Sequence, residues 1–270
     1  MHWAEYVLLF AAAAMAGAVN SVAGGGTLLT FPALLWSGQL AIVANATSTV
    51  ALVPGALSSF WGYRSELSSS RGELAALAVP SFAGGALGAL LLLRTSNEMF
   101  SLLVPYLILL ATMLFIAQEP LSRWLRRRAR VPHDPAADAA VGEAPPRRTR
   151  LRWAGVLVFQ LLVGLYGGYF GAGIGILMLA AFGFLGFANI HHMNALKNLN
   201  GTAINALAAG MFIYEGLVDW RLASLMAAGA IVGGYAGAGT ARRVGQRVVR
   251  RTIILIGLSL TAWLLIQQSW

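Results

Sequence analysis

One lysine stands inside an apolar stretch, where a charged side chain calls for a chemical explanation. Lys197 is the sole Lys among the 19 Lys and Arg residues. An ammonium group at membrane depth costs at least about 2.5 kcal/mol, and no Asp or Glu lies inside the same apolar run. At helical spacing it shares one face with Asn194, Asn198, Gly201 and Asn205. This face predicts binding of an anion; the alternative is a lysine that reaches back to the membrane surface.

Glycine clusters and polar stretches accompany this face. Gly24–Gly26 and 171–175 are rich in glycine, which destabilises a helix by about 1 kcal/mol per residue relative to Ala. A helix that restarts after such a break points its free N–H groups and positive dipole end at any anion nearby. The predicted substrate-binding residues are Asn20, Ser21, Gly24, Gly25, Gly26, Asn45, Thr47, Ser48, Thr49, Gly171, Gly173, Asn194, Lys197, Asn198 and Thr202.

Other chemistries find little support in the sequence. His191 and His192 could relay protons near neutral pH, but no third ligand stands near them, so no metal site is predicted. The chain has no Cys, no GxxxxGK[ST] motif and no nucleophile–base or paired-carboxylate pattern. We therefore expect neither an enzyme nor a bound cofactor.

The elements that position these residues follow from composition. The 270 residues are 58% hydrophobic and 11% charged, with a mean hydropathy of +0.69, whereas a soluble domain is about 25% charged. A membrane helix needs about 20 apolar residues. Apolar runs lie near 4–22, 27–44, 46–63, 74–93, 99–117, 153–172, 174–189, 195–214, 220–240 and 252–266. The sequence predicts an all-α polytopic membrane protein, in which the short runs 27–44 and 174–189 either cross or re-enter.

The two halves of the chain match at an offset of 149 residues. Glycine and asparagine matches carry this repeat, because Ala and Leu recur by chance in apolar sequence. The matching pairs include Gly24 with Gly173, Asn45 with Asn194, Gly84 with Gly233 and Gly88 with Gly237. We expect a first transmembrane repeat at 1–117, a basic, Pro-rich linker at 118–152 and a second repeat at 153–270, each with about five apolar segments.

The positions of the charges predict orientation. The net charge of +9 comes from Arg clusters at the ends of apolar runs, which fit the positive-inside rule better than nucleic acid binding. The linker 118–152 is therefore expected in the cytoplasm, with the chain in the cytoplasmic membrane. Whether five segments cross or the first two form a hairpin, the number of crossings is odd, so the second repeat is inverted. Small-residue spacings such as Gly84/Gly88 and Gly229/Gly233 fit packing within the bundle or, alternatively, a homodimer.

Several motifs resemble the TauE/SafE sulfite exporter family. They are the Gly-Ala-Val-Asn-Ser-Val-Ala-Gly-Gly-Gly-Thr segment at 17–27 followed by Pro32, the stretch from Ala44 to Tyr63-Arg64, and Gly-Gly-Tyr-Phe-Gly-Ala-Gly-Ile-Gly at 167–175. The resemblance implies a transporter of sulfur-containing anions, and its matching positions are Asn20, the glycines 24–26, Asn45, Thr47, Thr49 and the second glycine cluster. Lys197 is not part of it.

The residues and the resemblance together predict a secondary transporter. It would export sulfite or a small organosulfonate by alternating access between two inverted repeats. One alternative is a proton- or sodium-coupled uptake permease for a small organic anion. Another, of a different class, is an intramembrane enzyme or assembly factor.

Overall fold

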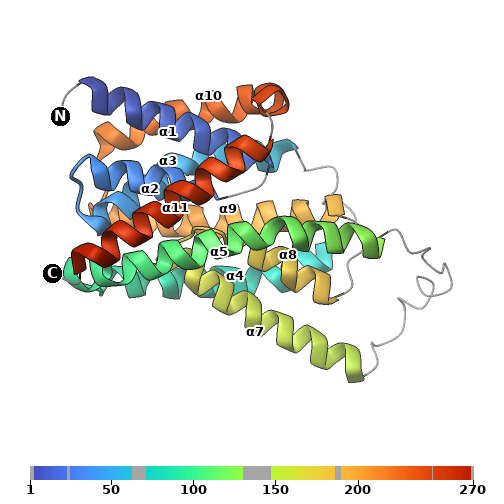
Figure 1. The fold of residues 1–270 in the computed structure, drawn as a ribbon. Coiled ribbons are helices and arrows are strands. Elements are labelled where there is room, and N and C mark those ends of the chain that lie inside the picture. Colours follow the sequence, from blue (N-terminus) through green and yellow to red (C-terminus); the bar gives the residue numbers. More distant parts are fainter. Residues whose placement is uncertain are drawn as a thin grey trace.

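The computed structural model describes residues 3–22, 25–62, 71–129, 147–185, 190–244 and 246–268. Within these ranges the fold is all α-helical (Figure 1). Its helices are α1 (Trp3–Val22), α2 (Thr27–Trp36), α3 (Ala41–Gly62), α4 (Arg71–Leu93), α5 (Asn97–Ala129), α7 (Arg147–Tyr169), α8 (Ile174–Leu185), α9 (Ile190–Tyr214), α10 (Trp220–Val244) and α11 (Gln246–Gln268). The prediction of an all-helical fold is confirmed.

The helices form an elongated bundle with two distinct ends (Figure 1). Both chain termini and the connections at 37–40, 94–96 and 215–219 lie at one end, which we call the terminal end. The end of α5 and the start of α7 lie at the opposite, linker end. Gln268 at the end of α11 donates a hydrogen bond of 3.0 Å to Ser101 O near the start of α5, which ties the C-terminus to the terminal end.

Each half begins with a hairpin of one long and one short helix. α1 runs from the terminal end into the bundle, and the ten-residue α2 returns to the same end (Figure 1). α7 runs in from the linker end, and the twelve-residue α8 returns to it. At about 1.5 Å per residue, α2 and α8 are too short to cross about 30 Å of hydrocarbon. Of the two arrangements left open by the sequence, the lengths of α2 and α8 favour the re-entrant one.

Two predicted boundaries are wrong. The apolar run 27–44 is not one segment, because α2 ends at Trp36 and α3 begins at Ala41. Ser37 closes α2, with its N–H bonded to Ala33 O, and Gly38 follows with a φ of +82°, a left-handed conformation that favours glycine. Asn45 therefore stands in the second turn of α3 and not at its start, so the polar residues after it lie deeper in the bundle than expected.

Helix also extends into both ends of the predicted linker. α5 continues from the apolar run through Pro120 to Ala129, and α7 begins at Arg147. Arg123 forms an ion pair with Glu119 one helical turn earlier, a spacing that supports a helix. Leu, Arg and Ala are also strong helix formers. The prolines at 132, 135, 145 and 146, expected to prevent a continuous helix, lie outside the described residues.

The second five helices repeat the packing of the first five. If α1–α5 correspond in order to α7–α11, the two most extensive contacts, α1 with α10 and α4 with α7, are counterparts. The same holds for α3 with α10 and α4 with α9, for α1 with α2 and α7 with α8, and for α2 with α11 and α5 with α8. α1 and α7 run in opposite directions (Figure 1). This packing supports the predicted inverted repeat.

Individual residues follow the same relationship. Thr112 on α5 and Thr261 on α11 are buried, 149 positions apart, and each donates a hydrogen bond to the carbonyl four residues earlier. A Cβ on Gly17 would overlap Ala230 O and Gly234 N, and a Cβ on Gly164 would contact Ser81 O and Gly85 N. The partner residues Ser81 and Ala230, and likewise Gly85 and Gly234, are again 149 positions apart, whereas Gly17 and Gly164 are 147 apart. The α1–α10 and α4–α7 contacts are therefore equivalent except that the first helix of each half is shifted by two residues.

Glycines bring these helix pairs into backbone contact. A Cβ on Gly84 or Gly88 would overlap the carbonyl oxygens of Leu161 and Leu165 on α7, and a Cβ on Gly233 would overlap Ala14 O on α1. Such contacts between small residues hold helices together in membranes, where apolar burial gives no net gain. These glycines are used within the chain, which favours packing inside the bundle over the predicted homodimer face.

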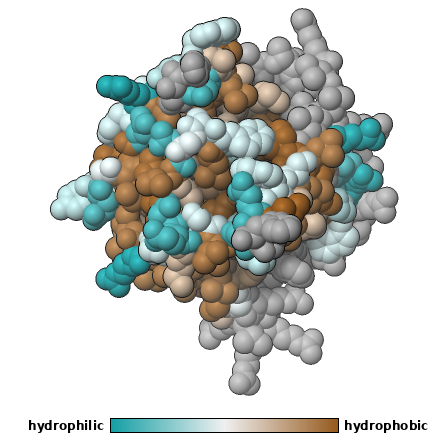
Figure 2. All heavy atoms as spheres, turned by 60° about the vertical axis from the view of Figure 1, so that its left-hand side comes forward, coloured by the Kyte–Doolittle hydropathy of each residue, from teal (hydrophilic) through white to brown (hydrophobic). Residues whose placement is uncertain are grey.

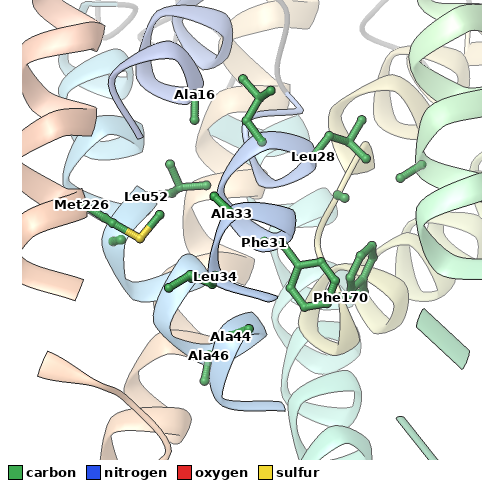
Figure 3. Packing of buried hydrophobic residues seen from close by; sticks show 14 of the residues in the cluster. Ala16, Leu28, Phe31, Ala33, Leu34, Ala44, Ala46, Leu52, Phe170 and Met226 are labelled. Carbon is green, nitrogen blue, oxygen red and sulfur yellow. The ribbon is translucent and has the colours of Figure 1, made fainter. Parts of the chain in front are cut away.

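The two hairpins meet in the hydrophobic core. Phe31 on α2 and Phe170 after α7 lie with their rings edge to face, 5.3 Å between centroids (Figure 3). Leu28, Leu34 and Met226 belong to the same cluster of buried hydrophobic residues. Offset or edge-on aromatic pairs add about 0.5–1.5 kcal/mol beyond burial. This contact joins the first hairpin directly to the second.

The surface is that of a membrane protein. Large hydrophobic side chains are exposed along the helices, among them Val79, Leu102, Val232 and Leu255. Among the described residues, three helices are long and apolar enough to cross a membrane by length and composition, at Trp3–Asn20, Ala76–Leu93 and Asn97–Leu121, and shorter apolar helices accompany them. Figure 2 turns the terminal end forward, where hydrophilic side chains lie scattered among hydrophobic ones.

Candidate functional site

Lys197 lies against the start of α8. It is 8% exposed, and a Cβ on Gly175 would stand 3.0 Å from its Cδ and 3.6 Å from its Cε. Gly175 is the second residue of α8, and Ile176 N just after it donates a hydrogen bond to Gly173 O. The earliest N–H groups of a helix have no partner within it. A buried cation thus faces the positive end of a helix dipole, which repels it.

No acidic side chain of the described residues offsets this charge. Among the described residues, the one ion pair joins Arg123 to Glu119, and Lys197 has no hydrogen-bond or ion-pair partner. Lys197 lies in the third turn of α9, one turn deeper than expected from the sequence. Its stem packs on the start of α8 and the residue is 8% exposed, which favours the anion-binding interpretation over a lysine that extends to the membrane surface. A buried, unpaired cation next to free N–H groups is arranged to receive an anion.

The break between α7 and α8 depends on two glycines with left-handed backbone. Gly171 has a φ of +82° and Gly173 a φ of +81°, values that side-chain-bearing residues rarely adopt. Phe170 N and Gly171 N both bond to Tyr166 O, a helix-ending pattern, and the Tyr166 hydroxyl donates to Ala172 O at 2.8 Å. These bonds tie the turn to the last turn of α7.

Asn45 reaches this break from the other half of the chain. Its Nδ2 donates a hydrogen bond of 3.1 Å to Tyr169 O, one of the free carbonyls at the end of α7. The side chain is 1% exposed, and its Oδ1 has no hydrogen-bond partner. Asn45 therefore closes the end of α7 and keeps one acceptor unsatisfied.

The predicted polar face of α9 follows the break. A Cβ on Gly171 would lie 3.4 Å from Asn205 Oδ1, and a Cβ on Gly201 would lie 3.8 Å from Ile174 Cδ1. Asn198 and Asn205 are half-buried. Thr202 lies to one side and donates a long hydrogen bond of 3.4 Å to Ala56 O on α3. The structure thus brings Lys197, Gly201 and Asn205 together along residues 171–175.

At the break between α1 and α2, side chains of the first half pair with the polar groups. Asn20 Oδ1 accepts a hydrogen bond of 2.8 Å from Gly26 N at the start of α2. Gly25 has a φ of +99°, and a Cβ on it would lie 3.1 Å from the Phe115 ring. The Ser48 and Thr30 hydroxyls share a hydrogen bond of 2.6 Å. These contacts give Asn20 and Ser48 structural roles in the hairpin.

Two further predicted residues bond to backbone groups. Thr47 Oγ1 accepts a hydrogen bond of 3.1 Å from Asp219 N, which fastens the turn before α10 to α3. Asp219 Oδ1 in turn caps α10 by accepting from Arg221 N and Leu222 N. Thr49 donates to Asn45 O at 2.8 Å. The first half of the predicted site is thus largely paired within the protein, whereas Lys197 in the second half is not.

For several predicted site residues, the structure does not describe the residue or its side chain. Gly24 lies outside the described residues, as do the side chains of Ser21, His191, His192 and Asn194. The predicted proton relay therefore stays a prediction. In the described ranges, no three His, Cys, Asp or Glu side chains gather as metal ligands.

One polar cluster was missed by the sequence reasoning. Ser81 on α4 donates to Asn200 Oδ1 at 3.0 Å, and Gln160 Nε2 on α7 donates to Ser81 Oγ at 2.8 Å. All three side chains are buried, and Gln160 Oε1 has no partner. The sequence offered one signal for this cluster, a single Gln and a single Ser within apolar runs. That these two side chains pair with each other depends on the fold. Asn200 lies three residues after Lys197, so the cluster fixes that part of α9 to α4 and α7.

The chain is similar to a known protein family over most of its length. The family model described as sulfite exporter TauE/SafE matches residues 9–264. The chain belongs to the TauE/SafE family. Its resemblance to that family in the glycine and asparagine motifs is confirmed.

Relatives of the TauE/SafE family are similar over nearly their whole length. A probable membrane transporter protein of Haemophilus influenzae is 28% identical over 97% of this chain and 95% of its own. One from Sinorhizobium, ORF9, is 27% identical over 95% and 91%. YfcA of Escherichia coli K12, also named a probable membrane transporter, is 28% identical over 96% and 88%. No solved structure matches. The chain is thus a member of a family of membrane transporters.

Proposed function

We propose that the protein is a secondary transporter that exports sulfite or a small organosulfonate across the cytoplasmic membrane by alternating access. The observation that carries this proposal is Lys197, which is buried, has no acidic partner among the described residues and packs on the first turn of α8. Two positive features that face one another become stable when an anion lies between them. The anion would contact the Lys197 ammonium and the N–H groups of Ile174 and Gly175.

Alternating access is supported by the arrangement of the halves. Transporters built from inverted repeats bind substrate at broken helices where the repeats meet. Here the equivalent pairs α1–α10 and α4–α7, each made of one helix from either half, are tightly packed through glycines, and α3 and α9 also contact each other across the halves. We infer that the two repeats, 1–117 and 153–270, are intertwined, and that a bundle around α1 and α10 rocks against a bundle around α4 and α7 at the 171–175 break.

Orientation follows from the charges at each end. The terminal end carries exposed Arg94, Glu98, Glu215 and Arg221, a mixed set. The linker end receives the Arg-rich termini of α5 and α7, so the positive-inside rule places it, with the linker, in the cytoplasm. An inside-negative potential contributes about 2.3 kcal/mol per charge per 100 mV to the exit of a monoanion, so export can proceed without a coupling ion.

The test is sulfite flux in proteoliposomes at set voltage. The intact protein should move sulfite, and Lys197→Met should raise KM about ten- to one-hundred-fold, since hydrogen bonds to charged groups contribute about 1.5–3 kcal/mol. Arg221→Met, which removes the same charge from an exposed position, should behave as the intact protein. Unchanged KM in Lys197→Met refutes the site, and absence of any anion flux in the intact protein refutes the function.

A further inference from the structure

The Ser81–Gln160–Asn200 cluster joins α9 to the helix pair α4–α7 beside the lysine. Both ends of the Asn200 amide are held: Nδ2 donates to Leu196 O on its own helix at 2.9 Å, and Oδ1 accepts from Ser81 Oγ on α4 at 3.0 Å. Gln160 on α7 donates to the same hydroxyl at 2.8 Å. Leu196 directly precedes Lys197. The cluster therefore holds α9 at the turn that carries the buried charge.

The equivalent positions in the other half are three alanines. They follow from the offset of 149 residues and from the offset of 147 for the first helix of each half. The corresponding pairs are Ser81 with Ala230, Asn200 with Ala51 and Gln160 with Ala13. All three alanines are fully buried. Apolar side chains thus close the junction of α1, α3 and α10, so the fold does not require polar side chains at the matching junction of α4, α9 and α7.

The cluster is not arranged for the greatest stability. Gln160 Oε1 is buried and has no hydrogen-bond partner, which destabilises a folded protein. The Ser81 hydroxyl has one proton, yet two acceptors lie within reach, Leu77 O at 2.6 Å and Asn200 Oδ1 at 3.0 Å. Three alanines would leave none of these acceptors unsatisfied. Polar groups retained at such a cost inside a membrane helix indicate a role in function.

The same half also holds the charge. The counterpart of Lys197 at the 149-residue offset is Ser48, an uncharged side chain that shares a hydrogen bond of 2.6 Å with Thr30. Lys197 must lie along Gly175 to bring its ammonium to the start of α8. Rotation of α9 about its axis would carry the ammonium away from those N–H groups. A polar cluster and a charge that needs precise placement thus occur together in one half.

We infer that Asn200, held by Ser81 and Gln160, is a positioning residue that sets the rotation of α9 and so keeps Lys197 on the first turn of α8. None of the three side chains touches the anion; they act through the lysine. Binding sites depend on such supporting contacts, because small displacements of a binding group cost much of its effect. The inference rests on the proposed anion site and explains how the fold maintains it.

The test is a pair of variants of the same shape at position 81. Ser81→Thr keeps the hydroxyl, and Ser81→Val has a methyl group in its place. In proteoliposomes, Ser81→Val should raise KM for sulfite about ten-fold, and Ser81→Thr should keep the KM of the intact protein. A purely structural role would lower the maximal flux through loss of folded protein and leave KM unchanged. Equal KM values in the two variants therefore overturn the inference.

A second variant tests the cluster from α7. Gln160→Met keeps the length of the side chain and removes the donor that holds Ser81. It should raise KM several-fold, whether or not Ser81→Val folds. An unchanged KM in Gln160→Met counts against the inference in the same way.

Two controls separate positioning from other effects. Ala230→Thr and Ala230→Val place the same two side chains at the equivalent position of the other half, and they should share one KM; a difference as large as that at position 81 overturns the inference. In the Lys197→Met background, Ser81→Val should add no further rise, because the cluster acts through the lysine. An additive rise overturns the inference while anion transport stands. Absence of sulfite flux in the intact protein overturns the proposed function, and this inference with it.

Discussion

The stem of Lys197 occupies the space that a side chain at Gly175 would need. A Cβ there would lie 3.0 Å from Lys197 Cδ and 3.4 Å from Cγ. The absence of a side chain at position 175 thus lets the lysine lie flat on the first turn of α8. It also brings the ammonium to the backbone N–H groups that would share its anion.

Gly175→Ala should therefore impair anion transport. The added methyl group must displace the Lys197 stem, and overpacking of this kind costs about 1–3 kcal/mol, so we expect KM for sulfite to rise about ten-fold. Gly210→Ala on α9 is the control, because nothing lies within 4 Å of a Cβ there. The measurement is initial flux in proteoliposomes. Equal KM values for Gly175→Ala and Gly210→Ala would mean that the lysine position does not matter for binding.

Two neighbouring glycines on α10 make it possible to test whether close backbone contact, and not the mere presence of a glycine, stabilises the protein. A Cβ on Gly233 would overlap Ala14 O on α1, whereas on Gly234 the nearest atom, Gly17 O, lies 4.0 Å away. Gly233→Ala should destabilise the protein by about 1–3 kcal/mol and lower its thermal midpoint by several degrees in detergent. Gly234→Ala should leave the midpoint nearly unchanged. Similar midpoints for both variants would contradict the α1–α10 contact.

Much of this fold could be read from the sequence, for physical reasons. Hydropathy marks the helices because hydrocarbon tolerates no unsatisfied backbone, and glycine clusters mark the breaks because glycine weakens helices. The turn at Ser37-Gly38-Gln39 was missed since it is short and flanked by the apolar Trp36 and Leu40. The turn depends on the left-handed φ of +82° at Gly38, and this backbone angle becomes known only from the folded chain.

The candidate site was predictable in part. Lys197 stood out because its charge has no partner in its apolar run, and its burial against α8 agrees with that reasoning. The sequence could not tell that Thr47 would pair with Asp219, which is 172 positions away. It also could not distinguish a polar residue paired within the protein, such as Ser48, from one without a partner among the described residues, such as Asn198. That distinction depends on tertiary contacts.

The Ser81–Gln160–Asn200 cluster should contribute to stability through the two hydrogen bonds that join its side chains. Ser81→Ala removes the hydroxyl that serves both amides, so we expect a loss of about 1–3 kcal/mol. Ser224→Ala, at an exposed hydroxyl bonded to Arg221 O, should lose almost nothing. Unfolding in detergent measures both. In a double-mutant cycle, Asn200→Leu should cost less in the Ser81→Ala background than alone, because the shared bond is already gone; strict additivity would contradict the cluster.

The orientation of the two ends can be tested directly because the chain has no Cys. Single cysteines need no background substitution, and the parent protein serves as the unlabelled control. Ser96→Cys and Glu215→Cys are exposed positions at the terminal end, and Arg123→Cys is exposed at the linker end. Since the Arg-rich end should face the cytoplasm, a membrane-impermeant thiol reagent should label Ser96→Cys and Glu215→Cys in intact cells, and Arg123→Cys only after permeabilisation. Ser96 follows α4 of the first half and Glu215 follows α9 of the second, so labelling of one from outside and the other from inside would contradict both the re-entrant hairpins and the inverted arrangement of the halves.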